Sequence, residues 1–295
     1  MNFFRFDSAQ ALRKFGSTTF DRSRPLAFMH IPKTSGTSIV HGVTAALSPA
    51  VVVGGETFKA IDERIHRDIY HSPQYIPNAN LVAGHFPFST LLRVYPLAQY
   101  LTILREPLSR LLSHWLYFRQ HTDADLGTWG EWGNRVKLAR KPLADFLNET
   151  SLAFQTDNLV VRMLLWPNPF VPDDQFIDPI NDGALLRQAM VRLRKFDFVD
   201  IVEDRASVRR LRRWLGYRFT YRRLNETAAI PRQFRSSLQS ELTAEAYECL
   251  YARSRLDLRI WSEVAANQLQ DLDVRKLREQ TLSANIARYS VLMAC

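Results

Sequence analysis

The sequence predicts an α/β protein with a P-loop-like parallel sheet that is flanked by helices on both faces. Short apolar runs alternate with segments of helical spacing in the first half of the chain, and the second half is mostly helical in pattern. A turn of Gly, Ser, Thr and Lys directly follows the first apolar run. Strands that alternate with helices favour a parallel sheet covered on both faces. We therefore expect about four or five strands and additional helices toward the C-terminus.

In the first half, the predicted strands are apolar runs that end at turn residues. They span residues 25–31, 50–53, 81–83 and 100–104. Helices are predicted at residues 38–47, 58–70 and from 107 to about 121. Pro107 suits the first turn of the last of these helices, because that position needs no backbone donor.

In the second half, the predicted helices span residues 143–148, 155–166, 184–195 and 205–215, with one or two more in residues 243–270. Residues 167–179 form a loop rich in Pro and Asp, and residues 196–202 form the last strand. No shift in composition marks a linker. We therefore expect a single domain over residues 1–295, with its core at about residues 25–262.

Composition excludes several classes of protein. The two cysteines, Cys249 and Cys295, form no CxxC pair, so a zinc–thiolate site or a thioredoxin-type centre lacks its ligands. Two isolated thiols suit a reducing cytosol. No apolar run approaches the ~18 residues that a membrane span needs. We therefore expect a cytoplasmic protein without a transmembrane segment.

The chain carries a net charge of +9, from 39 Lys and Arg against 30 Asp and Glu. This charge favours anionic partners, such as nucleotides, sulfated or carboxylated sugars, nucleic acid or a membrane surface. Charge alone does not choose among them.

The strongest motif is HIPKTSGTS, residues 30–38, between the first predicted strand and the first predicted helix. Unpaired N–H groups and the helix dipole favour an anion at such a helix start. Gly36 allows close approach of a phosphate, and Lys33 adds a mobile charge. Hydroxyl donors come from Thr34, Ser35, Thr37 and Ser38. The lysine precedes the glycine, so this is not the GxxxxGK[ST] order of P-loop NTPases. The alternative is a solvated turn with a capping Ser or Thr.

The second motif is LREPLSRLLSHW, residues 104–115. Arg105 closes a predicted strand, where the ligand-facing residues of open α/β sheets collect. Ser109 and Ser113 are four residues apart and share one helix face. A guanidinium with hydroxyl groups would hold a second anion. The alternative is that Arg105 pairs with Glu106 at the helix start.

Together the two motifs resemble those of the PAPS-dependent sulfotransferases, above all the carbohydrate sulfotransferases related to heparan sulfate 2-O-sulfotransferase and their bacterial relatives. Residues 30–38 are similar to the family's 5′-phosphosulfate loop, commonly xxPKTGGTS, and residues 104–115 to its 3′-phosphate segment, commonly RxPxxRxxSxY. Residues 82–87 (VAGHFP), 196–203 and 224–227 also resemble family segments. The resemblance extends from about residue 26 to residue 261.

The resemblance implies transfer of the sulfuryl group from PAPS to an acceptor hydroxyl on a carbohydrate by in-line displacement, with PAP as product and no metal. The residues expected to hold the 5′-phosphosulfate are Lys33, Thr34, Ser35, Gly36, Thr37 and Ser38. Arg105 and Ser113 are expected to hold the 3′-phosphate. His85 matches the general base, and Lys33 would stabilise charge on the leaving oxygen. The sequence departs from the family at Ser35, where Gly is usual, and at Trp115, where Tyr is common.

Other functions stay open at this stage. A P-loop-type kinase that uses ATP and Mg²⁺ on a small metabolite or sugar would explain the first motif. A basic nucleic-acid-binding protein would explain only the charge, so nucleic acid is not the expected partner. His114, beside Ser113, is an alternative to His85 as the base. The sequence does not define the acceptor, the position sulfated or the oligomeric state.

Three further features each have a structural and a functional interpretation. The eight arginines from Arg205 to Arg223 form either a solvated helix face or a patch that steers an acidic acceptor such as a glycan. Arg232 either reaches the nucleotide or lies apart from it. Trp129 and Trp132, in a predicted loop, either stack on a sugar ring or anchor packing.

Overall fold

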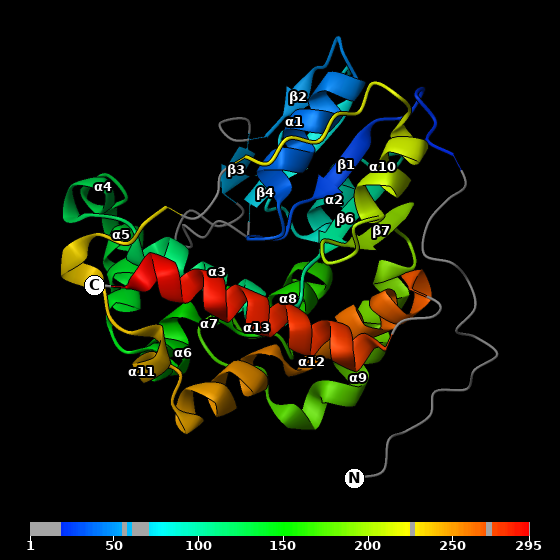
Figure 1. Ribbon diagram of the computed structural model, residues 1–295. Coiled ribbons are helices and arrows are strands. Elements are labelled where there is room, and N and C mark those ends of the chain that lie inside the picture. Colours follow the sequence, from blue (N-terminus) through cyan, green and yellow to red (C-terminus); the bar gives the residue numbers. More distant parts are fainter. Residues whose placement is uncertain (1–18, 55–57, 61–70, 225–227, 270–272, 295) are drawn as a thin grey trace.

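The computed structural model describes residues 19–54, 58–60, 71–224, 228–269 and 273–294. Five parallel strands form its central sheet, in the order β2-β5-β1-β6-β7 (Figure 1). They are β1 (Leu26–Met29), β2 (Val52–Val53), β5 (Leu81–Gly84), β6 (Gln99–Leu104) and β7 (Phe198–Ile201). The predicted α/β class and parallel sheet are therefore confirmed.

Helices cover both faces of this sheet. One face carries α1 (Gly36–Ala46) and α10 (Ser207–Leu215). The opposite face carries α2 (Phe88–Val94), α8 (Leu159–Leu165), α9 (Asp182–Leu193) and α12 (Ala244–Gln268). The other α-helices of the described chain are α3 (Pro107–Arg119), α4 (Asp123–Gly127), α5 (Gly130–Val136), α6 (Leu143–Asn148), α7 (Ala153–Thr156), α11 (Leu238–Glu241) and α13 (Val274–Met293). No helix of this described part is long and apolar enough to cross a membrane.

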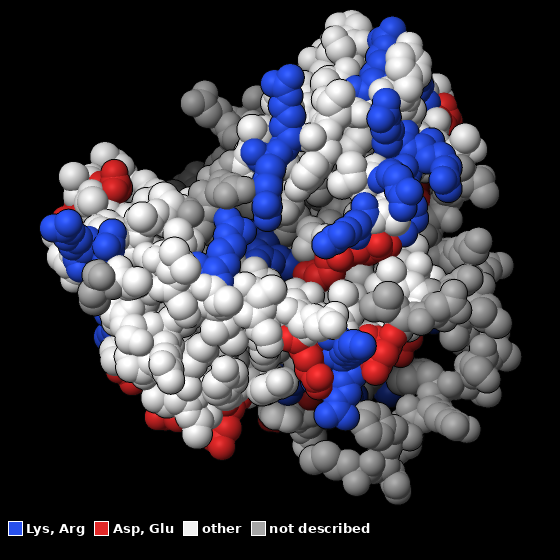
Figure 2. Space-filling model, in the orientation of Figure 1, with Lys and Arg blue, Asp and Glu red and all other residues white. Residues whose placement is uncertain are grey.

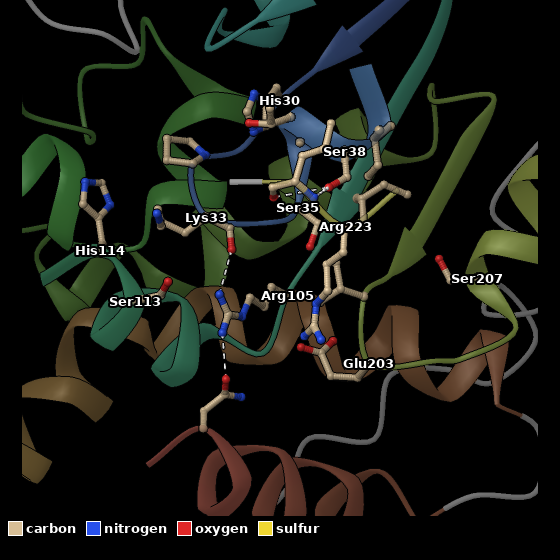
Figure 3. A pocket seen from close by; sticks show the side chains of 18 of the residues that line it. His30, Lys33, Ser35, Ser38, Arg105, Ser113, His114, Glu203, Ser207 and Arg223 are labelled. Atoms are coloured by element: carbon tan, nitrogen blue, oxygen red, sulfur yellow. Dashed lines mark hydrogen bonds between the residues drawn. The ribbon is translucent and has the colours of Figure 1, made fainter. Parts of the chain in front are cut away.

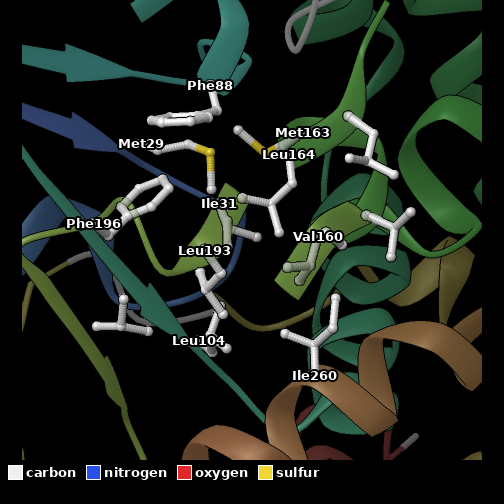
Figure 4. Close-up of a cluster of buried hydrophobic side chains, with 14 of the residues drawn as sticks. Met29, Ile31, Phe88, Leu104, Val160, Met163, Leu164, Leu193, Phe196 and Ile260 are labelled. Carbon is white, nitrogen blue, oxygen red and sulfur yellow. The ribbon is translucent and has the colours of Figure 1, made fainter. Parts of the chain in front are cut away.

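The strands are apolar throughout because both faces of the sheet are buried. All four residues of β1 are 0% exposed. Side chains alternate along a strand, so Leu26 and Phe28 pack toward α1 and α10, while Ala27 and Met29 pack toward α8, α9 and α12. Met29 lies among Phe88, Met163 and Phe196 from that second layer (Figure 4). A continuous apolar run is the pattern expected of a parallel strand covered on two sides.

The connections between the strands create a switch point at the middle of the sheet. From β1 the chain passes to β2 and β5 on one side, whereas from β6 it passes to β7 on the other. β1 and β6 are paired neighbours, with Phe28 opposite Leu101. Ligands of open α/β sheets bind where the carboxyl ends of two such strands adjoin. The loops that follow β1 and β6 are those of the two predicted anion-binding motifs.

Two predicted helices differ from the structure. Residues 58–60 of the helix expected at 58–70 form strand β3 (Phe58–Ala60), because they pair antiparallel with β4 (His71–Pro73); residues 61–70 lie outside the described chain. The helix expected at 155–166 is divided into α7 and α8. Asn158 is left-handed, with a φ of 45°, and its Oδ1 accepts a hydrogen bond of 2.8 Å from the backbone N–H of Leu256. A buried ion pair of 2.8 Å between Asp157 and Arg162 further fixes this break.

The segment around Trp129 and Trp132 is helical rather than a loop. Trp129 precedes α5 and Trp132 lies within it. The Trp132 ring is 5.6 Å from that of Phe118 and 5.5 Å from that of Phe154, centroid to centroid. Both tryptophans pack against the buried cluster around α3. Of the two interpretations of these tryptophans, the contacts favour the structural one, in which the rings stabilise packing.

Candidate functional site

A cavity of about 870 Å³ opens at the switch point of the sheet. It is walled by the loop after β1, His85, the first turns of α3, the segment after β7 and one face of α13 (Figure 3). Lys and Arg side chains gather around a hollow on this face of the molecule (Figure 2). The volume lies within the ~300–1,000 Å³ common for ligand sites. The predicted site residues that line it are Lys33, Ser35, Gly36, Thr37, Ser38, His85, Arg105 and Ser113.

The loop after β1 has an unusual backbone. Lys33 and Ser35 are both left-handed, with φ of 70° and 64°. Alternation of left- and right-handed residues turns successive N–H groups toward one point and forms an anion-binding concavity. Ser35 precedes α1, and its side chain does not cap the helix. Ser35 therefore provides no side-chain cap at the start of α1, where Gly36, Thr37 and Ser38 line the cavity, an arrangement that suits an anion.

Gly36 has a second role that the sequence did not indicate. A Cβ at this position would lie 1.7 Å from Nε2 of His30, so the His30 ring requires glycine there. The His30 ring also packs against that of His85, with centroids 4.5 Å apart. Burial and the neighbouring His85 and Lys33 hold the pKa of His30 well below 6.5. His30 is thus a neutral wall of the cavity, which sequence analysis left without a role.

The hydroxyl groups of the loop are not equivalent. Thr34 is 1% exposed, and its Oγ1 donates to the carbonyl of Ile31 at 2.8 Å, so this side chain stabilises the loop and does not line the cavity. Oγ of Ser38 accepts a hydrogen bond of 2.9 Å from the backbone N–H of Leu224. Ser35 and Thr37 are exposed toward the cavity.

Arg105 joins the two motifs. Its Nη1 donates to the carbonyl of Lys33 at 3.0 Å (Figure 3). Its Nη2 donates to Oδ1 of Asn285 at 3.0 Å and to the hydroxyl of Tyr289 at 2.8 Å. Glu106 instead caps α3, because its carboxylate accepts from the N–H groups of Leu108 and Ser109. The structure therefore does not support the alternative in which Arg105 only pairs with Glu106.

The two candidate bases are in opposite tautomers. Nδ1 of His85 lies 2.7 Å from the carbonyl of His30. A carbonyl only accepts, so Nδ1 carries a proton, and the neutral form of the ring has its lone pair on Nε2. Nδ1 of His114 lies 3.3 Å from Nη1 of Arg110. A guanidinium only donates, so His114 carries its proton on Nε2. Burial, Arg110 and Lys33 hold the pKa of His114 well below 6.5. His85 is equipped to accept a proton, and His114 to donate a hydrogen bond.

Lys33 and Glu203 are two further titratable groups of the cavity with large pKa shifts. Nζ of Lys33 lies 4.1 Å from the centre of the Tyr117 ring. Burial and the nearby Arg105 lower the pKa of Lys33 to about 8, so it is mostly charged at pH 7. Glu203 accepts from the N–H of Glu106 and from Nε1 of Trp261. Burial raises its pKa to about 7.

The basic segment from Arg205 to Arg223 serves several purposes. Arg210 is structural, because it makes two hydrogen bonds of 2.8 and 2.6 Å to the buried carboxylate of Asp200. Arg205 and Arg223 line the cavity. Exposed arginines, Arg209, Arg212, Arg213, Arg218 and Arg222, extend from it over the surface. Arg232 is exposed and does not line the cavity, and residues 225–227 lie outside the described chain.

Helix α13 is the largest part of the site that sequence analysis missed. It contributes Asn285 and Tyr289 to Arg105, and Arg288 to the cavity wall. Arg288 and Tyr289 follow Asn285 by three and four residues, the spacing of one helix face. That spacing of polar residues was the only signal available, and it does not distinguish a cavity wall from a solvated face.

Comparisons with known proteins give no family assignment. No family model matches the chain, and no curated protein matches it. Within the described residues, no group of three or more His, Cys, Asp or Glu side chains could hold a metal ion.

Replacement of Ser35 by Gly should stabilise the protein. A non-glycine residue in the left-handed region costs about 1 kcal/mol, and Ser35 makes no capping bond that would be lost. We expect Ser35→Gly to raise the free energy of unfolding by about 0.5–1 kcal/mol, measured by urea denaturation. Ser35→Ala, which keeps Cβ, is the control and should not stabilise. A glycine variant no more stable than the alanine variant would contradict the strained turn.

Replacement of Glu203 by Gln should change the pH dependence of stability. Below pH 4.5 the carboxyl group is protonated in both the folded and the unfolded state, so its ionisation does not affect the free energy of unfolding. Between pH 4.5 and about 7 it ionises only in the unfolded state, so wild-type stability falls as pH rises; above this window the loss is constant. The unfolding free energy of Glu203→Gln minus that of wild type should therefore rise by about 3 kcal/mol between pH 4.5 and 8. The control is Glu263→Gln, an exposed position in α12. A difference that does not change with pH would contradict the shifted pKa.

Proposed function

We propose that this protein is a PAPS-dependent sulfotransferase that transfers a sulfuryl group to a hydroxyl of a carbohydrate acceptor. The observation that carries the proposal is the meeting of two anion-binding segments in one cavity, joined by the hydrogen bond of 3.0 Å between Arg105 and the Lys33 carbonyl. PAPS carries anionic groups at both the 5′ and the 3′ position of one ribose. Two adjoining anion sites suit such a ligand better than they suit a nucleotide such as ATP, in which all the phosphates form a chain at one end.

The walls of the cavity match the parts of this nucleotide. The uncapped start of α1, the left-handed loop and Lys33 suit the 5′-phosphosulfate. Arg105 and Ser113 suit the 3′-phosphate. Val208, Leu211 and Leu224 provide apolar surface for an adenine ring. An ATP-dependent kinase is less well supported, because the lysine of the loop precedes its glycine.

The residues around His85 suggest how the reaction would proceed. The lone pair on Nε2 of His85 accepts the proton of the acceptor hydroxyl. The acceptor oxygen forms its bond to sulfur while the bond from sulfur to the 5′-phosphate oxygen breaks in line. Lys33 and the amide groups at the start of α1 stabilise the charge that develops on the departing oxygen. Most of the catalysis then comes from positioning and charge stabilisation, by analogy with phosphoryl transfer.

Nucleotide selectivity tests the proposal. We expect PAP to bind at least about tenfold more tightly than 5′-AMP, because charged hydrogen bonds contribute about 1.5–3 kcal/mol each. Arg105→Ala should remove most of this preference, whereas Arg209→Ala, an exposed arginine of α10, should keep it. Isothermal titration calorimetry measures both. Equal affinity of the wild type for PAP and AMP would contradict the proposal, and preferential binding of ATP with Mg²⁺ would favour the kinase.

The role of His85 is tested by turnover. His85→Ala should lower kcat about 10²–10⁴-fold, because it removes the proton acceptor, while the affinity for PAP changes less than about twofold. Steady-state rates with PAPS and calorimetry with PAP separate the two effects. Near-normal turnover in this variant would refute His85 as the base.

A further inference from the structure

Helix α13 contributes one continuous face to the cavity. The residues of this face are Thr281, Ala284, Asn285, Arg288 and Tyr289. They recur at intervals of three and four residues, so they lie on one side of the helix. Leu282, Ile286 and Met293 pack against the buried cluster around α3. The helix is therefore anchored by apolar contacts while its polar face lies toward the ligand space.

Two of these side chains fix the orientation of Arg105. Asn285 donates from Nδ2 to the carbonyl of Thr281 at 2.9 Å, so its Oδ1 is the atom turned toward Arg105, at 3.0 Å. The Tyr289 hydroxyl accepts from the same Nη2 at 2.8 Å, and the residue is 1% exposed. Both acceptors are themselves held in place. The plane of the guanidinium is consequently set by α13 and not by Arg105 alone.

The remaining donors of Arg105 then have a defined direction. A guanidinium has five N–H donors. Asn285, Tyr289 and the carbonyl of Lys33 take three of them. Within the described residues, the other two, one N–H of Nη1 and the N–H of Nε, are left for a ligand, and Arg105 lines the cavity. Because the guanidinium is fixed, an anion bound to either of them is held at a set distance from one bound at the start of α1.

Arg288 adds a second guanidinium to the same face. It lies in sequence between Asn285 and Tyr289, is half-buried, and lines the cavity with Arg105. A phosphate monoester carries a charge of about −1.5 to −2 at pH 7. One guanidinium does not neutralise this charge, whereas two do.

We propose that α13 is the specificity element of the nucleotide site. Asn285 and Tyr289 are positioning residues that orient Arg105, and Arg288 binds the same phosphate directly. The proposal rests on the proposed function, since the ligand group is the 3′-phosphate of PAP or PAPS. It assigns the distinction between this nucleotide and 5′-AMP to a helix of 20 residues near the C-terminus.

The decisive variants are Tyr289→Phe and Arg288→Ala. Tyr289→Phe removes one oxygen and keeps the ring, and it should weaken PAP binding about 5–15-fold, the effect of one hydrogen bond to a charged group. Arg288→Ala should weaken it about 10–100-fold. Neither should change the affinity for 5′-AMP by more than about twofold. The control is Arg275→Ala on the same helix, where the side chain is 81% exposed, and it should bind PAP as the wild type does.

A double variant distinguishes positioning from a general loss of structure. In an Arg105→Ala background, Tyr289→Phe should cause no further loss of PAP affinity, because the phenol acts through Arg105. An additional loss there would contradict the positioning role. Asn285→Ala, at a half-buried position, supplies the same test if Tyr289→Phe does not fold.

The outcomes separate this inference from the proposed function. A wild type that binds PAP and 5′-AMP equally would overturn both. A wild type that prefers PAP, with the full preference retained in Tyr289→Phe and Arg288→Ala, would overturn only the role of α13. Full preference in one of the two variants would overturn the role of that residue.

Discussion

The guanidinium of Arg105 connects three segments that are far apart in the chain. Arg105 itself follows β6, it donates to the loop after β1 through the Lys33 carbonyl, and it donates to Asn285 and Tyr289 of α13. A partly buried charge costs several kcal/mol unless its donors are paired. These contacts therefore stabilise Arg105 and also fix the two candidate anion-binding segments relative to each other. The geometry of the cavity follows from this set of hydrogen bonds.

The chemistry of the cavity depends on the same loop. The left-handed Lys33 turns its carbonyl to Arg105, while its ammonium group lies over the Tyr117 ring. Burial and the nearby Arg105 lower the pKa of Lys33 to about 8, and an anion that binds there would offset the repulsion between the two cations. The carbonyl of His30 orients His85 and leaves its Nε2 as an acceptor. The loop thus supplies positive charge to the cavity and orients the candidate base His85 beside it.

The sequence predicted the elements that are determined by their own residues and not by contacts with distant parts of the chain. β1, β6 and α3 were found because their apolar runs end at clear turn or helix-start residues. The break at Asn158 was not, because it depends on hydrogen bonds with α12, nor was β3, which exists through its pairing with β4. The two motifs predicted the residues at the centre of the candidate site. The contribution of α13 was not predicted, because its polar face can be recognised as a cavity wall only from its contacts with Arg105. Thr34 is the opposite case. Its hydroxyl belongs to the predicted motif, but it donates a hydrogen bond to the loop itself.

Sulfuryl transfer from ³⁵S-labelled PAPS to a panel of carbohydrates tests the central claim most directly. Release of PAP is measured in the same reaction, and a parallel reaction contains γ-³²P-labelled ATP with Mg²⁺. The account predicts labelled sulfate on a carbohydrate hydroxyl, one PAP released for each sulfate transferred, and no transfer of labelled phosphate. Transfer of phosphate from ATP, with no transfer of sulfate from PAPS to any acceptor, would contradict it.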